Sequence, residues 1–361
     1  MHVKVFSSLD KLRESWLTLQ QQGVFYIFQS IQWIDVWLQT AGKGLKEELF
    51  ILAVSQAEND PPFMIIPLSI YKKNGIRYLG GLGGGHTDFA GAVLQNNAQS
   101  LYSTELLWEN IIKKARLNRV DIIRIRKIPS MIENMPNPLF SSLCVHEEMN
   151  YAINLKTTWE KYYSSKIKTK IKSDLKRRKK LLTEQGVVKF YVAENKDEKN
   201  RLTKVMISQK TKRYQYKNIK NQFELADNID LYIQVTDKLP TSHLSALMLN
   251  DIVLAVHWGI VFDGRFYHIM PAHDEKYGKY APGKILLMHL IEWSFQNKLS
   301  YFDFTCGNEI YKKDFANVEN ILYEFNKPIS LKGKIYFDFR NKLGELKERM
   351  KTNKSLSETN S

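Results

Sequence analysis

The stretch Gly264–Phe315, GRFYHIMPAHDEKYGKYAPGKILLMHLIEWSFQNKLSYFDFTCGNEIYKKDF, decides the fold. Apolar and polar residues alternate over Gly264–Met270, which predicts a half-buried strand. Pro282 and Gly283 then open a helix, because a first helical turn has no use for the N–H that proline lacks. The apolar run Tyr301–Thr305 predicts a second, buried strand. The stretch therefore predicts one β-α-β unit.

Groups that can bind anions or transfer protons lie at the start of the helix and after the second strand of this unit. The helix start offers backbone N–H groups and a positive dipole end, which suit a phosphate or pyrophosphate. Cys306–Phe315 brings a carboxylate, an amide, a phenol and ammonium groups to the carboxyl end of the second strand, where open α/β sheets place their chemistry. We therefore expect a cleft in which Pro282–Gly283 faces Tyr311–Lys312.

The composition bounds the class of protein. A chain of 361 residues with 43% hydrophobic residues predicts two packed units. Two cysteines make no disulfide framework, and neither a signal peptide nor a long apolar run is visible, so a soluble cytoplasmic protein is expected. The net charge of +15 predicts an anionic partner, which could be a phosphate-bearing cofactor, a carrier protein, RNA or an acidic membrane face.

The predicted elements divide the chain into a first domain over 1–153, a second over 154–334 and a C-terminal helix with a polar tail over 335–361. In the first domain, helices are expected at 8–22, 30–40 and 101–116, and strands at 1–6, 49–54, 63–71, 77–82, 120–126 and 144–153. The run GGLGGG at 80–85 is not followed by a helix signal, so it does not predict a dinucleotide loop. Asp88 beside it is a candidate polar contact for a ligand.

The second domain opens with a strongly basic segment. A helix is expected over 166–182, and Lys166–Lys180 holds nine Lys or Arg residues against one Asp. Ile167, Ile171, Leu175 and Leu182 are spaced for one buried stripe. The segment is either a solvated helix face or an anion-binding ridge, and because no RNA-module signature accompanies it, sequence-specific nucleic-acid reading is not expected. A strand at 187–193, a helix at 197–214 and a hairpin at 244–262 lead into the β-α-β unit, and a strand is expected at 321–329.

The order of several segments resembles the CelD/BcsL-type branch of the GNAT acyltransferase superfamily, which is related to the FemAB peptidyltransferases. The resemblance covers nearly the whole chain, and QSIQWIDVW, IIRIRKIP and WEKYY belong to it. Its most specific parts are Tyr280-Ala281-Pro282-Gly283, Asp303-Phe304 with Gly307, and Tyr311-Lys312. It implies a mixed α/β protein of two tandem GNAT-like folds, each a mixed central sheet flanked by helices.

The resemblance also implies transfer of an acyl group from acyl-CoA or acetyl-CoA to an amine. The sequence lacks the Q/R-x-x-G-x-G/A pyrophosphate loop of ordinary GNAT proteins, and Tyr277–Lys284 occupies its place. The donor-binding residues implied are Tyr280, Ala281, Pro282, Gly283 and Lys284. No metal is expected, because the spacings of His257, His268, His273 and Cys306 match no familiar site.

Acyl transfer to an amine needs a neutral amine, stabilisation of an oxyanion and a proton for the leaving group. Lys312 resembles the lysine of the FemAB pattern F-K-x-x-F-G, which makes it a candidate for oxyanion or acceptor-phosphate stabilisation, and Tyr311 is a candidate acid. Asp303 is either a base or, as we favour, the anchor that orients Lys312. His268 and His273 are candidate bases.

For each of these residues a purely structural role remains open. Candidate substrate contacts are Asp88, Asp274, Asn308 and Glu309.

The expected function is N-acylation of an amino sugar or related precursor of a surface polysaccharide, with acyl carrier protein as an alternative donor. Two other functions stay open at this point. One is a Fem-like aminoacyl transferase that uses aminoacyl-tRNA, with the basic helix as its tRNA contact. The other is a non-catalytic adaptor that binds an anionic membrane or complex.

Overall fold

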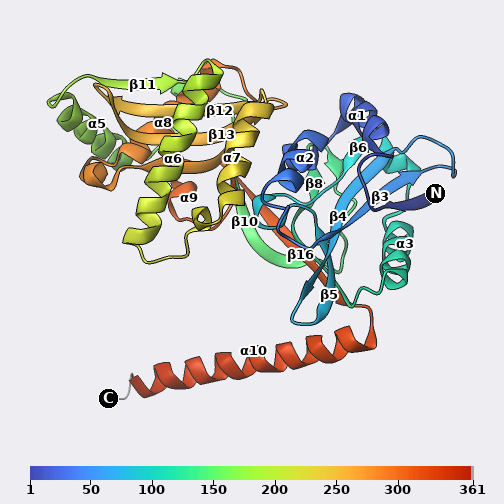
Figure 1. Ribbon diagram of the computed structural model, residues 1–361. Helices are drawn as coiled ribbons and strands as arrows, with labels where there is room; N and C mark the ends of the chain where they lie inside the picture. The colour runs from blue at the N-terminus through green and yellow to red at the C-terminus, as the bar shows by residue number, and fades with distance from the viewer. Residues whose placement is uncertain (359–361) are drawn as a thin grey trace. The chain divides into compact units, whose positions relative to one another are not determined.

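A computed structural model describes residues 1–358 of the protein, with the side chains of the last helix described to residue 343 and at residue 345. The chain forms two compact units (Figure 1). Unit 1 comprises residues 1–29, 46–146 and the chain from 323 on, and unit 2 comprises residues 30–45 and 147–322. Neither unit is continuous in sequence. The helix at Ile31–Gln39, from the predicted first domain, belongs to unit 2.

Unit 1 is built on a mixed sheet. Its strands run in the order β1 (His2–Phe6), β3 (Glu48–Ser55), β4 (Met64–Lys73), β5 (Ile76–Gly81) and β7 (Ile122–Pro129). All neighbours are antiparallel except β5 and β7, which are parallel. Short elements complete the unit: β2 (Gly23–Val24), β6 (Val93–Gln95), β8 (Met131–Ile132), β9 (Met135–Pro136), η1 (Ile27–Gln29), η2 (Gly84–His86) and η3 (Ala98–Leu101).

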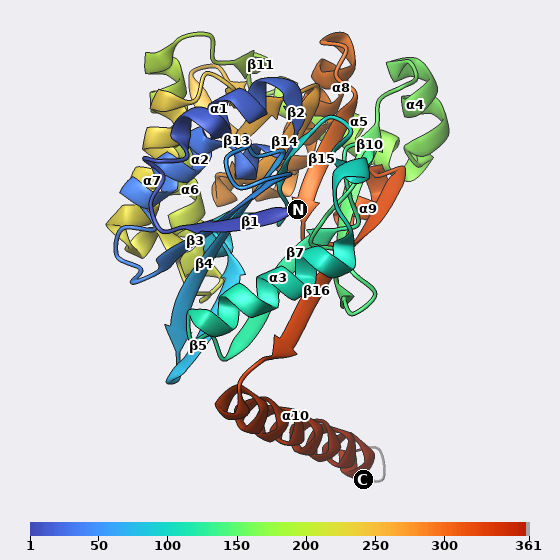
Figure 2. The ribbon, with the colours of Figure 1, turned by 90° about the vertical axis from the view of Figure 1, so that its right-hand side faces the viewer.

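Three helices accompany this sheet, namely α1 (Arg13–Gln22), α3 (Thr104–Leu117) and α10 (Leu331–Glu358). Helix α3 lies across β16 (Val318–Pro328) (Figure 2). Trp108 of α3 stacks on Phe325 of this strand with ring centroids 3.8 Å apart. The start of α10 docks on Asp121, whose carboxylate accepts a 2.6 Å hydrogen bond from the Ser330 hydroxyl. A Cβ on Gly333 would lie 2.1 Å from the Asp121 carbonyl oxygen, so this contact requires glycine.

Unit 2 is also built on β-strands of mixed direction. Its strands run in the order β10 (Val145–Asn154), β15 (Tyr301–Cys306), β14 (Arg265–His273), β13 (Ile252–Phe262), β12 (Ser242–Leu249) and β11 (Val188–Val192). Only β14 and β15 among these pairs are parallel. The helices are α2 (Ile31–Gln39), α4 (Trp159–Lys166), α5 (Thr169–Thr183), α6 (Lys196–Tyr216), α7 (Ala226–Lys238), α8 (Pro282–Gln296) and α9 (Tyr311–Phe315), with η4 (Gln222–Glu224) and η5 (Glu275–Tyr280).

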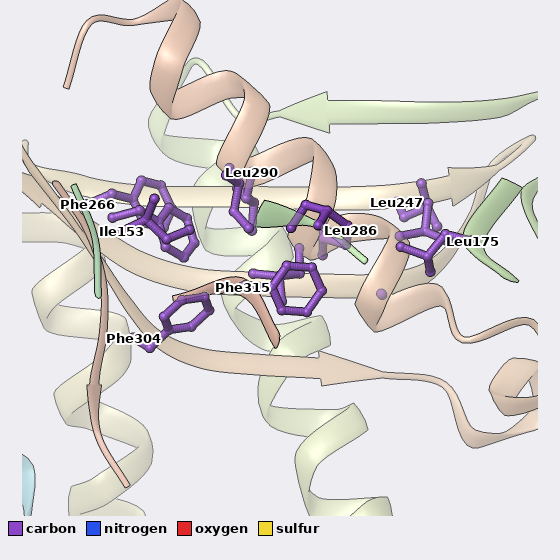
Figure 3. Packing of buried hydrophobic residues seen from close by; sticks show 14 of the residues in the cluster. Ile153, Leu175, Leu247, Phe266, Leu286, Leu290, Phe304 and Phe315 are labelled. Atoms are coloured by element: carbon purple, nitrogen blue, oxygen red, sulfur yellow. The ribbon is translucent and has the colours of Figure 1, made fainter. Parts of the chain in front are cut away.

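The alternation of residues along β13 separates the two faces of this sheet. The Trp258 indole donates a 2.9 Å hydrogen bond to Thr236 of α7, on the face that α6 and α7 cover (Figure 1). The preceding residue, His257, stacks with Phe266, which contacts Trp293 of α8 on the opposite face. Figure 3 shows Leu286 and Leu290 of α8 and Phe315 of α9 pointing into the apolar core of that second face.

The predicted mixed α/β class, with helices on mixed sheets, is confirmed. The expected hairpin and the strand-helix-strand order of 264–315 are also confirmed, although the first strand extends to His273. The basic helix differs, because α4 ends at Lys166 and α5 begins at Thr169, with the backbone extended at Ile167, whose side chain is buried. The first helix begins at Arg13 rather than residue 8, and α10 extends to Glu358 through part of the predicted tail, whose last residues, 359–361, lie outside the described part of the chain.

None of the helices described over residues 1–358 combines the length and the apolar character needed to span a bilayer.

We predict that Gly333→Ala destabilises unit 1 by about 1–3 kcal/mol, because the new methyl group must push α10 away from the Asp121 carbonyl. Gly85→Ala is the matched control, since its Cβ meets nothing within 4 Å. Urea unfolding of both variants checks this. Equal midpoints for the two would show that α10 does not depend on this close approach.

Candidate active site

The two parallel strands of unit 2 form the frame of the candidate site. The register of β14 with β15 pairs Arg265 with Tyr301, Phe266 with Phe302 and Tyr267 with Asp303. The described pairing ends there, although β14 continues to His273 and β15 to Cys306. The carboxyl ends of the two strands therefore place their polar side chains at one edge of the sheet, where open α/β sheets bind ligands.

Asp303 holds the paired part of the two strands together. Its carboxylate is 1% exposed and accepts hydrogen bonds from Arg265 Nη1 at 2.8 Å and Asn150 Nδ2 at 2.7 Å. It also accepts a 2.8 Å hydrogen bond from the Thr305 N–H, which fixes the left-handed backbone of Thr305 (φ 56°) at the end of β15. The expectation that Asp303 directly orients Lys312 is wrong, because its charged partner is Arg265.

Lys312 is a buried lysine, with 3% of the residue exposed. Its ammonium donates to the Cys306 carbonyl at 2.8 Å and the Gly307 carbonyl at 3.4 Å, and it lies 2.9 Å from Glu309 Oε2. These three acceptors match the three donors of an ammonium group. Lys312 thus fixes the turn between β15 and α9. Burial raises the pKa of Glu309, but the hydrogen bond and the charge of Lys312, a backbone hydrogen bond and the charge of Lys210 together outweigh burial and leave that pKa below its ordinary value.

His273 lies at the end of β14, next to the start of α8. A Cβ built on Gly283 would be 3.6 Å from His273 Nδ1, and His273 Nε2 lies 3.5 Å from Glu275 Oε1. Burial lowers the pKa of His273, and the charges of Arg213 and Lys210 act in the same direction while Glu275 opposes them. The imidazole is therefore mainly neutral at pH 7 and able to accept a proton.

Lys210 of α6 is a member of this cluster that the sequence reasoning missed. Burial lowers its pKa to about 8, and its charge acts on Glu309, His268 and His273. Leu202, Met206 and Lys210 follow one another at intervals of four residues, so Lys210 continues a buried helical stripe. A lysine in line with buried apolar residues of a helix is the sequence signal that could have identified Lys210.

His268, the other candidate base, lies inside the core. Its ring stacks on His257 with centroids 4.3 Å apart and meets the rings of Phe302 and Phe304. Burial lowers the pKa of His268 to about 3, so it stays neutral and is a poor proton acceptor. Of the two candidate bases, His273 is therefore the better proton acceptor.

The helix start that the sequence singled out has an unusual backbone. Ala281 caps α8 in the left-handed region at φ 51°, Pro282 occupies the first turn, and Gly283 follows. Tyr280 is held from the side by a hydrogen bond between its hydroxyl and Gln185. The Arg178 guanidinium of α5 donates to the Lys279 carbonyl, so the basic helix reaches the segment that precedes α8. Lys284 is exposed on the first turn.

The remaining candidates have identifiable contacts. Asp274 caps η5 by accepting from the Lys276 N–H at 3.0 Å, and Asn308 accepts from the Met149 N–H at 3.2 Å. Burial raises the pKa of Tyr311, whose ring packs against the core. Asp88 belongs to unit 1, where it pairs with Lys127 at 3.1 Å. Among the side chains described, no three His, Cys, Asp or Glu residues are grouped to hold a metal.

Comparison with solved structures identifies the fold. FemX matches with a TM-score of 0.60 and 8% identity, over 90% of this chain and 97% of that chain. The C-terminal domain (DUF2156) described as lysylphosphatidylglycerol synthetase from Agrobacterium fabrum matches at 0.52 and 9% identity, over 81% and 91%. The L-PGS structure from Bacillus licheniformis matches at 0.50 and 11% identity, over 86% and 96%. No curated protein sequence matches significantly.

The family comparison falls on unit 2. Residues 169–313 match the family model described as an acetyltransferase (GNAT) domain. The matched segment begins with α5 and ends in α9, so it contains the α8 start, His273 and the turn held by Lys312. Nothing in the comparisons distinguishes the CelD/BcsL branch within this superfamily. Residues 169–313 thus match the GNAT acetyltransferase domain model, in a chain whose fold is similar to that of FemX.

Proposed function

We propose that the protein is an N-acyltransferase that moves an acyl group from acyl-CoA to an amine, with an amino sugar or related precursor of a surface polysaccharide as acceptor. Acyl carrier protein is the alternative donor. One observation carries the proposal: a neutral histidine, His273, lies against the first turn of α8 within the GNAT domain. This brings a proton acceptor next to the backbone that suits a phosphate-bearing donor.

The donor site follows from the charges around α8. The N–H groups of a first helical turn have no intrahelical acceptor, which favours binding of a diphosphate. Lys284 lies on that turn, and Arg178 and Lys279 are joined by a hydrogen bond just before it. The charge of α5 thereby contributes to the donor site, which unites the two basic features seen in the sequence.

The acceptor amine attacks the thioester carbonyl carbon as a neutral nucleophile. His273 accepts the proton that the amine loses, and Glu275 stabilises the resulting imidazolium from the other ring nitrogen. The carbon–sulfur bond then breaks, and the Tyr311 hydroxyl, which its raised pKa keeps protonated, donates a hydrogen bond to the departing thiolate. The thiolate takes its proton from solvent, and the His273 imidazolium returns one to solvent, so both side chains end in their starting forms. Lys312 positions the turn that carries Glu309, with Asp303 fixing the strand below it.

We predict that His273→Asn lowers kcat about 10²- to 10⁴-fold, since the proton acceptor is removed. The measurement is thiol release from acetyl-CoA with glucosamine and a panel of other primary amines as acceptors. His146→Asn, at an exposed position in unit 1, is the matched control and should retain wild-type turnover. Unchanged turnover in His273→Asn would remove this assignment, and a wild-type protein inactive on all amines would count against acyl-CoA as donor.

The pH profile gives a second prediction. The neutral imidazole is the active form, so kcat/KM rises with pH through the pKa of His273. Lys210→Met removes a positive charge that lowers this pKa, so the acid limb moves to higher pH. Lys204→Met, on the exposed side of the same helix, leaves the limb in place. If the acid limb of the kcat/KM profile does not move in Lys210→Met, the charge of Lys210 does not affect the pKa of the proton acceptor.

The alternative is a Fem-like aminoacyl transfer from aminoacyl-tRNA. Lys170, Lys176 and Lys180 of α5 are exposed, which would let that helix contact a phosphate backbone. If this is the function, tRNA binds in a salt-sensitive manner and replacing these three lysines with glutamine weakens binding at least tenfold. Equal tRNA binding before and after the replacement, together with acetyl-CoA turnover, would exclude it.

A further inference from the structure

Unit 1 contains a cavity of about 300 Å³ that the acyl-transfer chemistry of unit 2 does not use. It lies beside the glycine-rich segment 80–85, of which Gly80, Gly81, Gly84 and Gly85 line it. Charged and aromatic side chains line it, among them Glu47, Tyr71, Arg124, Arg126 and Lys127. Its size is at the low end for small-molecule sites, which suits a ligand of monosaccharide size.

The backbone of β7 aims three cations at this cavity. Arg124 and Arg126 lie on the same face of the strand, and Ile125 between them is fully buried on the other face. Lys127 has φ 57°, a left-handed conformation that is uncommon for lysine. This departure from strand geometry breaks the alternation, so Lys127 also reaches the cavity. Such departures are concentrated at binding sites.

Carboxylates beside the cavity hold these cations in place. Glu324 lies 2.8 Å from Arg124 Nε and 3.9 Å from Arg126 Nε, and Asp88 lies 3.1 Å from the Lys127 ammonium. The Lys127 ammonium also donates to the Thr87 carbonyl at 3.1 Å. Neither Glu324 nor Asp88 is among the residues that line the cavity. The arrangement is therefore that of a pre-organised binding site, in which supporting groups orient the binding groups.

The glycine segment keeps the cavity open. A Cβ on Gly83 would lie 2.0 Å from Thr87 Oγ1, and the backbone there is left-handed at φ 100°, so this position requires glycine. Cβ atoms on Gly84 and Gly85, which both line the cavity, would meet nothing within 4 Å. Glycine at these two positions thus leaves open the space through which a ligand would enter the cavity.

We propose that this cavity binds the phosphate group of a small, soluble phosphate ester. Three cations and one carboxylate, Glu47, line it, and the Glu47 carboxyl is itself engaged by the Ser69 hydroxyl at 2.7 Å. Guanidinium groups match the oxygens of a phosphate in geometry as well as charge. Glu47 and the backbone of the glycine segment then face the hydroxyl groups of the ester. The lining residues all belong to unit 1, so binding at this site can be tested independently of the acyl transfer proposed for unit 2.

Isothermal titration calorimetry with glucosamine 6-phosphate, inorganic phosphate and uncharged glucosamine tests the site. We expect the wild-type protein to bind glucosamine 6-phosphate, to bind inorganic phosphate more weakly and not to bind glucosamine here. Arg126→Ala should weaken phosphate-ester binding at least tenfold, and its side chain is 54% exposed, so the fold tolerates the change. Arg119→Ala, an exposed arginine of the same unit outside the cavity, is the control with the same loss of charge.

A steric variant gives an independent readout. Gly85→Leu places a side chain into the open space beside the cavity without changing any charge, and should also weaken binding at least tenfold while thermal unfolding stays near that of the wild type. Equal losses in Arg126→Ala and Arg119→Ala would show that phosphate responds only to general positive charge. That result would overturn the proposal, as would binding to phosphatidylglycerol vesicles without any binding of the soluble ester.

Discussion

The buried ion pair between Asp303 and Arg265 is the interaction on which the candidate active site depends. It connects Arg265, the first residue of β14, with Asp303 in the middle of the parallel strand β15, and the same carboxylate fixes the turn of backbone at Thr305. Removing one partner of such a pair leaves an uncompensated buried charge, which costs about 3–5 kcal/mol. Everything at the far ends of β14 and β15 is positioned relative to this clamp, including the loop that Lys312 holds.

Burial also sets the protonation of the groups above the clamp. Three histidines lie in the core, namely His243, His257 and His268. Burial lowers the pKa of each, so all three imidazoles are neutral at pH 7. His273 and Lys210 are only partly buried. Burial lowers the pKa of His273, and it lowers the pKa of Lys210 to about 8, which is close to the physiological range. The result is a gradient from an inert interior to a titratable rim. Proton transfer belongs at that rim, where groups can change charge at modest cost.

Much of the fold could be predicted from the sequence, and the reasons are local. The hairpin of β12 and β13 and the strand-helix-strand order around α8 carry strong periodicity and turn signals, so they were predicted with nearly correct bounds. The basic helix was predicted to begin at Lys166 rather than at Thr169, because neither proline nor glycine marks the break between α4 and α5. The partner of Asp303 was missed for a different reason. Arg265 lies far away in sequence, and only the register of two parallel strands brings them together.

The discontinuity of unit 1 has a consequence for biosynthesis. Phe325, which covers Trp108, and Ser330 and Gly333, which dock on Asp121, are synthesised after all of unit 2. The nascent amino-terminal sheet must therefore wait, with Trp108 uncovered, while residues 147–322 of unit 2 are translated. That unit, which requires only α2 from the earlier part of the chain, is complete first. The order of maturation is thus the reverse of the order of synthesis, and truncation near the carboxyl terminus would damage the part of the protein made first.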